Sequence, residues 1–330
     1  MRPQSGFSSA HTVTVFIPGL TGRDPWPLAW PRSLARFIAR ASATTRASEG
    51  LTDRTLDLFG LAKSTGLAAL ARLGEGQAPS TQWWVRCDPV HLAVDGDRLL
   101  LVDNETIGLT DEEAKRLSAV VTEVFAEENG AIEVHAPNRW YLTLPRPKAL
   151  QVAGLAEVTG RNIQNLLPEG DQRYWRTRLN EVQMVLHQAL VGSHGGEGSG
   201  LCVNSVWFWG PGLAPAEAPA RFAQVYTDDV LVKGAATLTH ASWALTPASP
   251  EGLAPEGPIL LVLRGAQGPV QYGDTEGWSA FLEALVKSWL QPLAKRLASG
   301  SLQELIVVGD RGPAFHLTRR DLWRFWRSWR

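Results

Sequence analysis

Sulfur-containing residues are scarce in this chain, which has two cysteines, Cys87 and Cys202, and two methionines among its 330 residues. The two cysteines do not have metal-ligand spacing, and they are too few to form a disulfide framework. A reduced, cytoplasmic location is the simplest interpretation.

Long hydrophobic runs and an excess of one charge are also absent. No apolar stretch reaches the roughly 20 residues that span a bilayer, so no transmembrane segment is predicted. The start, MRPQSGFSSAHTVTVFIPG, lacks a signal-peptide core and cleavage site. The 32 Lys and Arg residues balance 33 Asp and Glu residues to a net charge of −1. This balance argues against nucleic-acid binding, which usually requires a basic face. We find no internal repeat.

What the sequence does contain is enough apolar material for a sizeable core. It is 44% hydrophobic and 20% charged, and its 14 tryptophans predict a Trp-rich core. Short apolar strands alternate with helical segments, which predicts an α/β protein with a mainly parallel sheet. Strands are expected over 13–17, 83–94, 99–103, 132–136, 140–144, 203–209, 259–263 and 305–308. Helices are expected over 33–43, 50–73, 110–128, 175–190 and 278–297.

The middle of the chain has a strand–strand–helix–strand–strand order of its own. We therefore expect a core formed by 1–80 and 201–330, with an inserted α+β lobe over 81–200. In open α/β sheets, ligands bind beyond the carboxyl ends of the strands. Pro18-Gly19 and Asp310 follow two such strands. A single carboxylate there is either a metal ligand or a structural cap.

Other catalytic patterns are missing. The glycine-rich stretch 194–200 is not followed by the Gly-Lys-Ser/Thr of a P-loop, and no Gly-x-Ser-x-Gly elbow occurs. None of the seven histidines forms a His-x-x-x-His or His-Glu-x-x-His pair. Cys87 follows Arg86, which either lowers the pKa of its thiol or leaves an inert strand cysteine.

Two arginines, Arg86 and Arg139, lie on predicted strands among apolar neighbours. A buried arginine needs an anionic partner. That partner is either a carboxylate of the same protein or the phosphate or carboxylate of a ligand.

Several blocks of the sequence, in this order, resemble the inserted lobe and following strand of archaeal-type cofactor-independent phosphoglycerate mutases, of the alkaline phosphatase superfamily. The blocks are Val85–Leu92 (VRCDPVHL), Gly108–Ala114 (GLTDEEA), Asn138–Leu144 (NRWYLTL), Gly160–Ile163 (GRNI), Leu167–Gly170 (LPEG) and Val203–Gly212 (VNSVWFWGPG). Within that superfamily the chain is most similar to a proteobacterial group, the RpfE-type regulatory proteins. Asn180–Met184 and Leu322–Arg327 resemble that group in particular. The match is best over about 80–235. It implies an alkaline-phosphatase-like core with an inserted lobe.

The metal-site residues of the mutases are largely replaced in this chain. Where the mutases have a metal-binding Asp-Gly after the first strand, this chain has Pro18-Gly19, and only Ser33 follows as a poor candidate nucleophile. The last strand ends in Asp310-Arg311 rather than Asp-His. The resemblance leaves Asp274, Asp310 and His316 as remnants of a metal site. The mutase chemistry would use Mn, Zn or Mg, but with so few ligands we expect no cofactor.

The resulting hypothesis is a non-catalytic, regulatory or anion-sensing protein, a pseudoenzyme of bacterial origin. Arg86, Arg139 and Asn204 are its candidate ligand-binding residues, and a small phosphorylated metabolite or a protein is the expected partner. Two alternatives stay open at this point. One is an active metal-dependent phosphoglycerate mutase or phosphatase with a rearranged site. The other is a protein-interaction scaffold.

The C-terminus is basic and rich in tryptophan. Thr318 and Asp321 have capping-box spacing, which predicts a helix of about three turns from Arg319. Its aromatic side would either pack on the protein's own sheet or form a contact surface for a membrane or a partner.

Overall fold

The structure, a computed structural model, describes residues 11–23, 26–27, 29–44, 48–164, 166, 169–191 and 202–324. The chain divides into two compact units. The first combines Met1–Lys63 with Ala216–Arg330, and the second is Ser64–Pro215. The second unit is wider than the lobe expected over 81–200. It includes helix α3 (Leu67–Gly74) and strand β12 (Ser205–Gly212), because α3 packs on β12 and β12 pairs with β6 (Trp84–Asp95).

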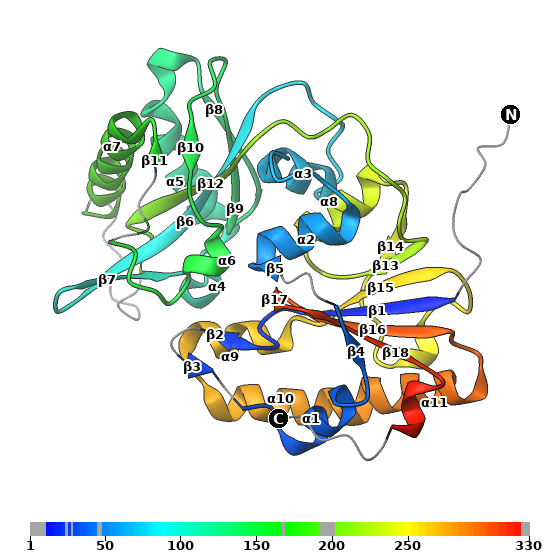
Figure 1. The fold of residues 1–330 in the computed structure, drawn as a ribbon. Coiled ribbons are helices and arrows are strands. Elements are labelled where there is room, and N and C mark those ends of the chain that lie inside the picture. Colours follow the sequence, from blue (N-terminus) through cyan, green and yellow to red (C-terminus); the bar gives the residue numbers. More distant parts are fainter. Residues whose placement is uncertain are drawn as a thin grey trace, which may run out of the picture. The chain divides into compact units, whose positions relative to one another are not determined.

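A seven-stranded sheet of largely parallel strands forms the centre of the first unit, in the order β14-β13-β15-β1-β16-β18-β4 (Figure 1). The first five strands in that order are mutually parallel. β18 pairs antiparallel with β16, and β4 pairs antiparallel with β18. The strands are β1 (Thr12–Ile17), β4 (Ser42–Ala43), β13 (Gln224–Tyr226), β14 (Ser242–Ala244), β15 (Pro258–Val262), β16 (Glu304–Gly309) and β18 (Ala314–Thr318). The predicted α/β class with a mainly parallel sheet is therefore confirmed.

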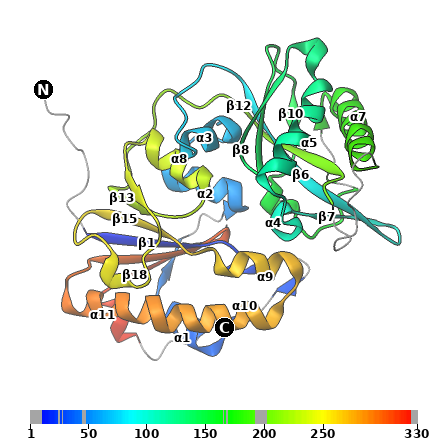
Figure 2. The ribbon, with the colours of Figure 1, turned by 180° about the vertical axis from the view of Figure 1, so that it is seen from behind.

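Helices cover both faces of this sheet (Figures 1 and 2). On one face lie α1 (Arg32–Ile38), α10 (Thr275–Leu285) and α11 (Gln291–Ser299), and on the other lie α2 (Leu51–Phe59) and α8 (Val230–Leu238). Side chains of α1, α10 and α11 share one buried apolar cluster with β1, β15 and β16. The smaller elements are β2 (Gly22–Arg23), β3 (Trp26–Pro27), β5 (Ser48–Glu49), η2 (Pro250–Gly252), η3 (Arg264–Ala266), α9 (Gln267–Tyr272), β17 (Arg311–Gly312) and η5 (Asp321–Trp323).

The second unit has an antiparallel sheet in the order β12-β6-β9-β8, with β7 also paired to β6. Its other strands are β7 (Arg98–Val102), β8 (Ala131–Ala136), β9 (Arg139–Thr143), β10 (Leu150–Gln151) and β11 (Glu169–Gly170). Its other helices are α4 (Asn104–Ile107), α5 (Asp111–Glu123), η1 (Ala126–Glu128), α6 (Leu155–Val158) and α7 (Gln172–Val191). The expected tryptophan-rich core is present: Trp84, Trp140, Trp175 and Trp207 are buried here, and Trp278 is buried in the first unit.

Local signals predicted many of the longer elements. The capping box of α5 is complete, since the Thr110 hydroxyl accepts from the backbone N–H of Glu113 and the Glu113 carboxylate accepts from that of Thr110. The helix expected over 50–73 is wrong as a single element. Gly60 adopts φ +67 and ends α2 in a left-handed cap, and α3 begins only at Leu67.

The helix expected over 278–297 is interrupted by a π-helical turn, η4 (Val286–Leu290), that joins α10 to α11. Pro292 follows this turn and has no N–H to donate to the carbonyl one turn earlier, which accounts for the local change of helical pitch. Within the described part of the chain, no helix is both long enough and apolar enough to cross a membrane.

The C-terminal helix expected from Arg319 does not form over the described residues. Thr318 and Asp321 do interact as their spacing predicts, because the Thr318 N–H and hydroxyl both donate to the Asp321 carboxylate. The chain then forms only the 3₁₀ turn η5, and residues 325–330 lie outside the described residues. So does the glycine-rich stretch 194–200.

His11, just before β1, gives the first unit a pH-dependent contact. Its ring is 7% exposed and lies 3.2 Å from the Gly257 carbonyl oxygen and 3.1 Å from an Arg296 nitrogen. This arrangement suits the neutral ring, which donates to the carbonyl and accepts from the guanidinium. Burial, together with the charge of Arg296, lowers the pKa of His11 against the opposing effects of the Gly257 carbonyl and Glu256.

Because the pKa of His11 is lower in the folded state, its contribution to stability is present above the ordinary histidine pKa of about 6.5 and is lost as the pH falls through the folded value. Between neutral pH and pH 5, the wild type should lose more unfolding free energy than His11→Gln. Denaturant unfolding at a series of pH values measures this. Parallel curves for the two proteins would contradict the assignment.

Candidate functional site

The carboxyl edge of the parallel sheet in the first unit brings together the two strand ends that the sequence singled out. β1 and β16 are neighbours, with Ile17 opposite Gly309, so Gly19 and Asp310 follow adjacent strands. The Asp310 carboxylate accepts a hydrogen bond from the Gly19 N–H at 2.9 Å. Gly19 adopts φ +83, and a Cβ at this position would lie 2.8 Å from the Ala266 carbonyl oxygen. A tight glycine turn therefore gives Asp310 its partner.

Arginines surround this carboxylate. Arg54 of α2 is buried, and its guanidinium donates to the Gly309 and Gly312 carbonyl oxygens on either side of Asp310. Burial raises the pKa of Asp310, against the opposing effects of the Gly19 N–H and the charges of Arg311 and Arg54. Burial likewise lowers the pKa of Arg54. Two arginines, Arg54 and Arg311, therefore lie near the Asp310 carboxylate.

The remaining metal-site remnants have other roles. The Asp274 carboxylate caps α10 by accepting from the Gly277 N–H at 2.8 Å. His316 lies in β18 and pairs with Glu304, at the start of β16 and so at the opposite end of that strand from Asp310. Among the described residues, no group of three or more His, Cys, Asp or Glu side chains could hold a metal ion. Ser33 is an exposed residue of α1. As far as the structure describes the chain, its residues do not fit the two-metal site that the mutase resemblance implies.

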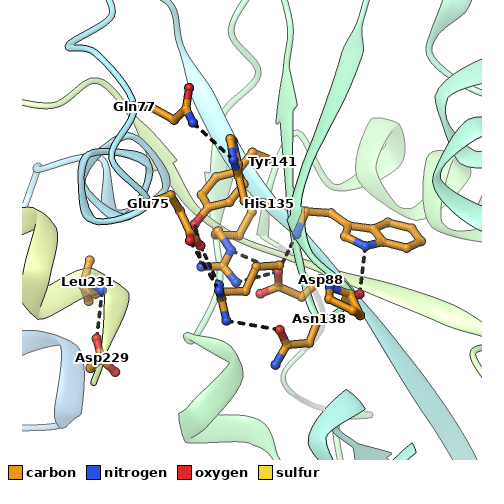
Figure 3. Close-up of polar contacts among 12 residues, drawn as sticks. Glu75, Gln77, Asp88, His135, Asn138, Tyr141, Asp229 and Leu231 are labelled. Atoms are coloured by element: carbon orange, nitrogen blue, oxygen red, sulfur yellow. Dashed lines mark hydrogen bonds and ion pairs between the residues drawn. The ribbon is translucent and has the colours of Figure 1, made fainter. Parts of the chain in front are cut away.

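The two arginines predicted on strands lie in one polar network of the second unit, together with Asp88, Tyr141 and Glu75, which Figure 3 labels. Arg86 is 4% exposed, and its Nε and Nη2 donate to one oxygen of Asp88 at 3.0 and 2.7 Å. Its guanidinium also lies over the rings of Tyr141 and Trp209, 4.7 and 5.2 Å from their centroids. The partner of Arg86 in the structure is therefore a carboxylate of the same strand.

Asp88 has further donors. It accepts from the Trp209 indole N–H at 2.7 Å and from the Trp140 backbone N–H at 3.2 Å. Burial raises the pKa of Asp88, while the charge of Arg86 and the Trp209 hydrogen bond lower it. Burial also raises the pKa of Tyr141. A buried carboxylate with this many donors and a guanidinium counter-ion stays charged at neutral pH.

Arg139 pairs with Glu75, at the C-terminal end of α3. Its Nε and Nη2 donate to the two carboxylate oxygens, and the Tyr141 hydroxyl donates to one of them at 3.1 Å (Figure 3). The Arg139 side chain is 30% exposed, against 5% for Arg86. Arg139 is therefore the more accessible of the two arginines.

A third arginine, Arg72 of α3, was not singled out from the sequence. It donates to both carboxylate oxygens of Glu133 and lies 3.9 Å from the centroid of a Trp84 ring. His135 contacts the same Glu133 carboxylate at 3.0 Å. Like Glu75, Arg72 lies on a helix more than 60 residues from its partner, and no local pattern in the sequence marks the pairing.

Asn204 joins β12 to β6 rather than joining this network. Its side-chain oxygen accepts from the Leu92 N–H at 2.8 Å, and its amide nitrogen donates to the Leu92 carbonyl at 3.0 Å. The side chain extends the strand pairing by imitating a backbone peptide. Its predicted contact with a ligand stays a prediction.

The two cysteines differ in exposure. Cys87 is buried, and burial together with the charge of Asp88 raises the pKa of its thiol despite the neighbouring Arg86. The lowered pKa considered from the sequence is therefore wrong, because desolvation outweighs the adjacent guanidinium. Cys202 is exposed.

In the native protein, one thiol should react rapidly with a thiol reagent, and both should react after denaturation. Cys202→Ser should abolish the rapid reaction, while Cys87→Ser should leave it unchanged. A Cys202→Ser protein that still reacted at the native rate would show that Cys87 is accessible.

No protein-family model and no curated protein matches this sequence. Among solved structures, the chain is similar to the PH0037 protein from Pyrococcus horikoshii at 12% identity and a TM-score of 0.54, over 93% of this chain and 86% of that one. It is also similar to the cofactor-independent phosphoglycerate mutase from Thermoplasma acidophilum at 14% identity and a TM-score of 0.43, over 94% of this chain and 90% of that one. At such identities the similarity concerns the fold alone, and it rests on the first of these structures. The RpfE-type resemblance stays a prediction.

Proposed function

We propose that this chain is a non-catalytic protein with a phosphoglycerate mutase-like fold and a regulatory or anion-sensing role. The observation that carries the proposal is the environment of Asp310. Its carboxylate accepts from the Gly19 N–H, and the cations Arg54 and Arg311 lie close enough to affect its pKa. A divalent cation at Asp310 would gain this carboxylate as a ligand and would be repelled by the two arginines. That gain does not offset the cost of dehydrating the ion.

Phosphoryl transfer on a two-metal site relies on the ions to activate the nucleophile and to neutralise charge. We therefore expect no phosphoglycerate mutase or phosphatase turnover above background when Mn, Zn or Mg is supplied. The test compares the wild type with Asp310→Ala. Saturable turnover by the wild type that disappears in Asp310→Ala would overturn the proposal in favour of an active enzyme with a rearranged site.

The sensing role would use the arginines of the polar network in the second unit. Each is paired with a carboxylate of the protein, and an anionic ligand could take the place of that carboxylate. Phosphate and carboxylate both bind guanidinium in a bidentate manner, so a phosphorylated metabolite could compete with Glu75 for Arg139. Arg139 suits this exchange better than Arg86, because its side chain is partly exposed whereas Asp88 and Arg86 are both buried. In this proposal Arg86 holds Tyr141, and through it Glu75, in place.

A thermal-shift screen with glycerate and sugar phosphates tests the exchange. An active compound should stabilise the wild type, and Arg139→Lys should weaken its binding, because lysine lacks the bidentate contact of a guanidinium. Arg178→Lys is the matched control, since Arg178 pairs with Glu128 and Glu181 elsewhere in the same unit. The absence of any hit, or a hit unchanged by Arg139→Lys, would leave Arg139 as an internal ion-pair partner only.

A further inference from the structure

Helix α1 of the first unit separates apolar and basic side chains onto opposite sides. Leu34, Phe37 and Ile38 are buried in the core cluster. Arg32 and Arg36 are exposed one turn apart, and Arg40 follows at the same spacing in the turn after the helix. No acidic residue occurs between 29 and 44, so nothing along this stretch neutralises the arginines.

The segment after β18 lies beside the end of this helix. β18 pairs with β4, which follows α1 directly, and Arg324 donates to the Ser42 hydroxyl at 3.3 Å. Arg319 and Arg320 of the segment are exposed.

The one acid of this segment offsets the charge of Arg324 and does not pair with Arg319 or Arg320 among the described ion pairs. Asp321 is 6% exposed, accepts from Thr318 and pairs with Arg324 at 2.6 Å. Because Arg324 contacts Ser42, just after α1, two groups of arginines that are far apart in sequence lie on neighbouring segments of the first unit.

An exposed tryptophan accompanies these arginines. Leu322 packs against the core cluster and anchors η5, whereas Trp323 is 72% exposed. The interpretation that all the aromatic side chains here pack on the protein's own sheet is therefore wrong for Trp323. Tryptophan is the side chain that most favours the boundary between lipid headgroups and acyl chains.

We propose that this arginine face, formed by Arg32, Arg36, Arg40, Arg319, Arg320, Arg324 and Trp323, binds the surface of an anionic phospholipid bilayer. Arginines near such a surface are attracted by its negative potential and bind lipid phosphates, while the tryptophan enters the interface. Within the described residues 29–44 and 319–324, Trp323 is the one exposed aromatic residue among these cations. Such an arrangement fits a bilayer surface better than a protein partner, which would bury a larger apolar area. Glu276 and Glu283 of the neighbouring α10 are exposed and reduce the attraction. Because salt screens the attraction between the arginines and the lipid phosphates, binding should weaken as salt is added.

The full-length protein is tested by flotation with vesicles of phosphatidylcholine alone and of an equimolar mixture with phosphatidylserine. It should bind the mixed vesicles and not the neutral ones. Arg32→Glu with Arg36→Glu should weaken binding about tenfold or more, since each arginine near the surface contributes about 1 kcal/mol. Trp323→Ala should also weaken binding, and this loss should persist at higher salt.

The matched control is Arg173→Glu with Arg176→Glu, which reverses two exposed charges on α7 of the second unit. It should bind as the wild type does, and circular dichroism confirms that each variant is folded. Failure of the wild type to bind the mixed vesicles would overturn the proposal, including the case in which it binds duplex DNA or an acidic protein instead. Equal losses in the α1 variant and the α7 control would overturn it as well.

Discussion

Replacing Asp88 with asparagine is expected to lower the free energy of unfolding by about 3–5 kcal/mol. The substitution keeps the shape of the side chain but removes the charge that neutralises Arg86, which is buried beneath Tyr141 and Trp209. A buried guanidinium without a counter-ion costs far more than the ion pair itself contributes. Denaturant unfolding of the two proteins gives the difference directly.

The matched control is Asp53→Asn, which breaks the ion pair with Lys63 on the surface of the first unit. Exposed pairs contribute about 0–1 kcal/mol, so this variant should be nearly as stable as the wild type. Combining Arg86→Met with Asp88→Asn should cost less than Asp88→Asn alone, because no unpaired guanidinium is left and the amide oxygen can still accept from Trp209 or Trp140. Similar small losses for Asp88→Asn and Asp53→Asn would show that Arg86 is not held by its carboxylate.

The second large effect is expected at Gly19. Gly19→Ala should lower the free energy of unfolding by about 2–4 kcal/mol, because the new side chain meets two penalties. The backbone is left-handed at φ +83, and the added Cβ would lie 2.8 Å from the Ala266 carbonyl oxygen. The turn that presents its N–H to Asp310 would have to move.

Gly96→Ala separates these two penalties. Gly96 is also left-handed, at φ +63, but a Cβ there has nothing within 4 Å. This variant should lose only the conformational contribution, about 1–2 kcal/mol. If Gly19→Ala were no more destabilising than Gly96→Ala, the close approach of Ala266 would not constrain the Asp310 turn.

Local sequence signals were sufficient for much of the fold. Apolar β-branched runs located β1, β15 and β16, and the capping pair Thr110 and Glu113 located the start of α5. The interruption at Gly60 was missed because a glycine within a helical pattern is compatible with either a helix or a cap. β13 and β14 were missed because each has only three residues, and the nine-residue helix between them, α8, was missed as well.

The candidate sites were predicted only where the interacting residues are close together in the sequence. The need of Arg86 for an anionic partner followed from its apolar neighbours. Asp88 lies two residues further along the same strand and so on the same face, and the sequence alone could have identified it as that partner. Glu75, the partner of Arg139, lies 64 positions away, and only the folded chain brings the two together.

The account depends most on the claim that the carboxyl edge around Asp310 does not hold a catalytic metal. Elemental analysis of the purified protein, after incubation with Mn, Zn and Mg and removal of the excess, tests this directly. We expect no stoichiometric metal, and an identical result for Asp310→Ala. One or two tightly held metal ions per chain, lost in Asp310→Ala, would contradict the account and identify a working metal site.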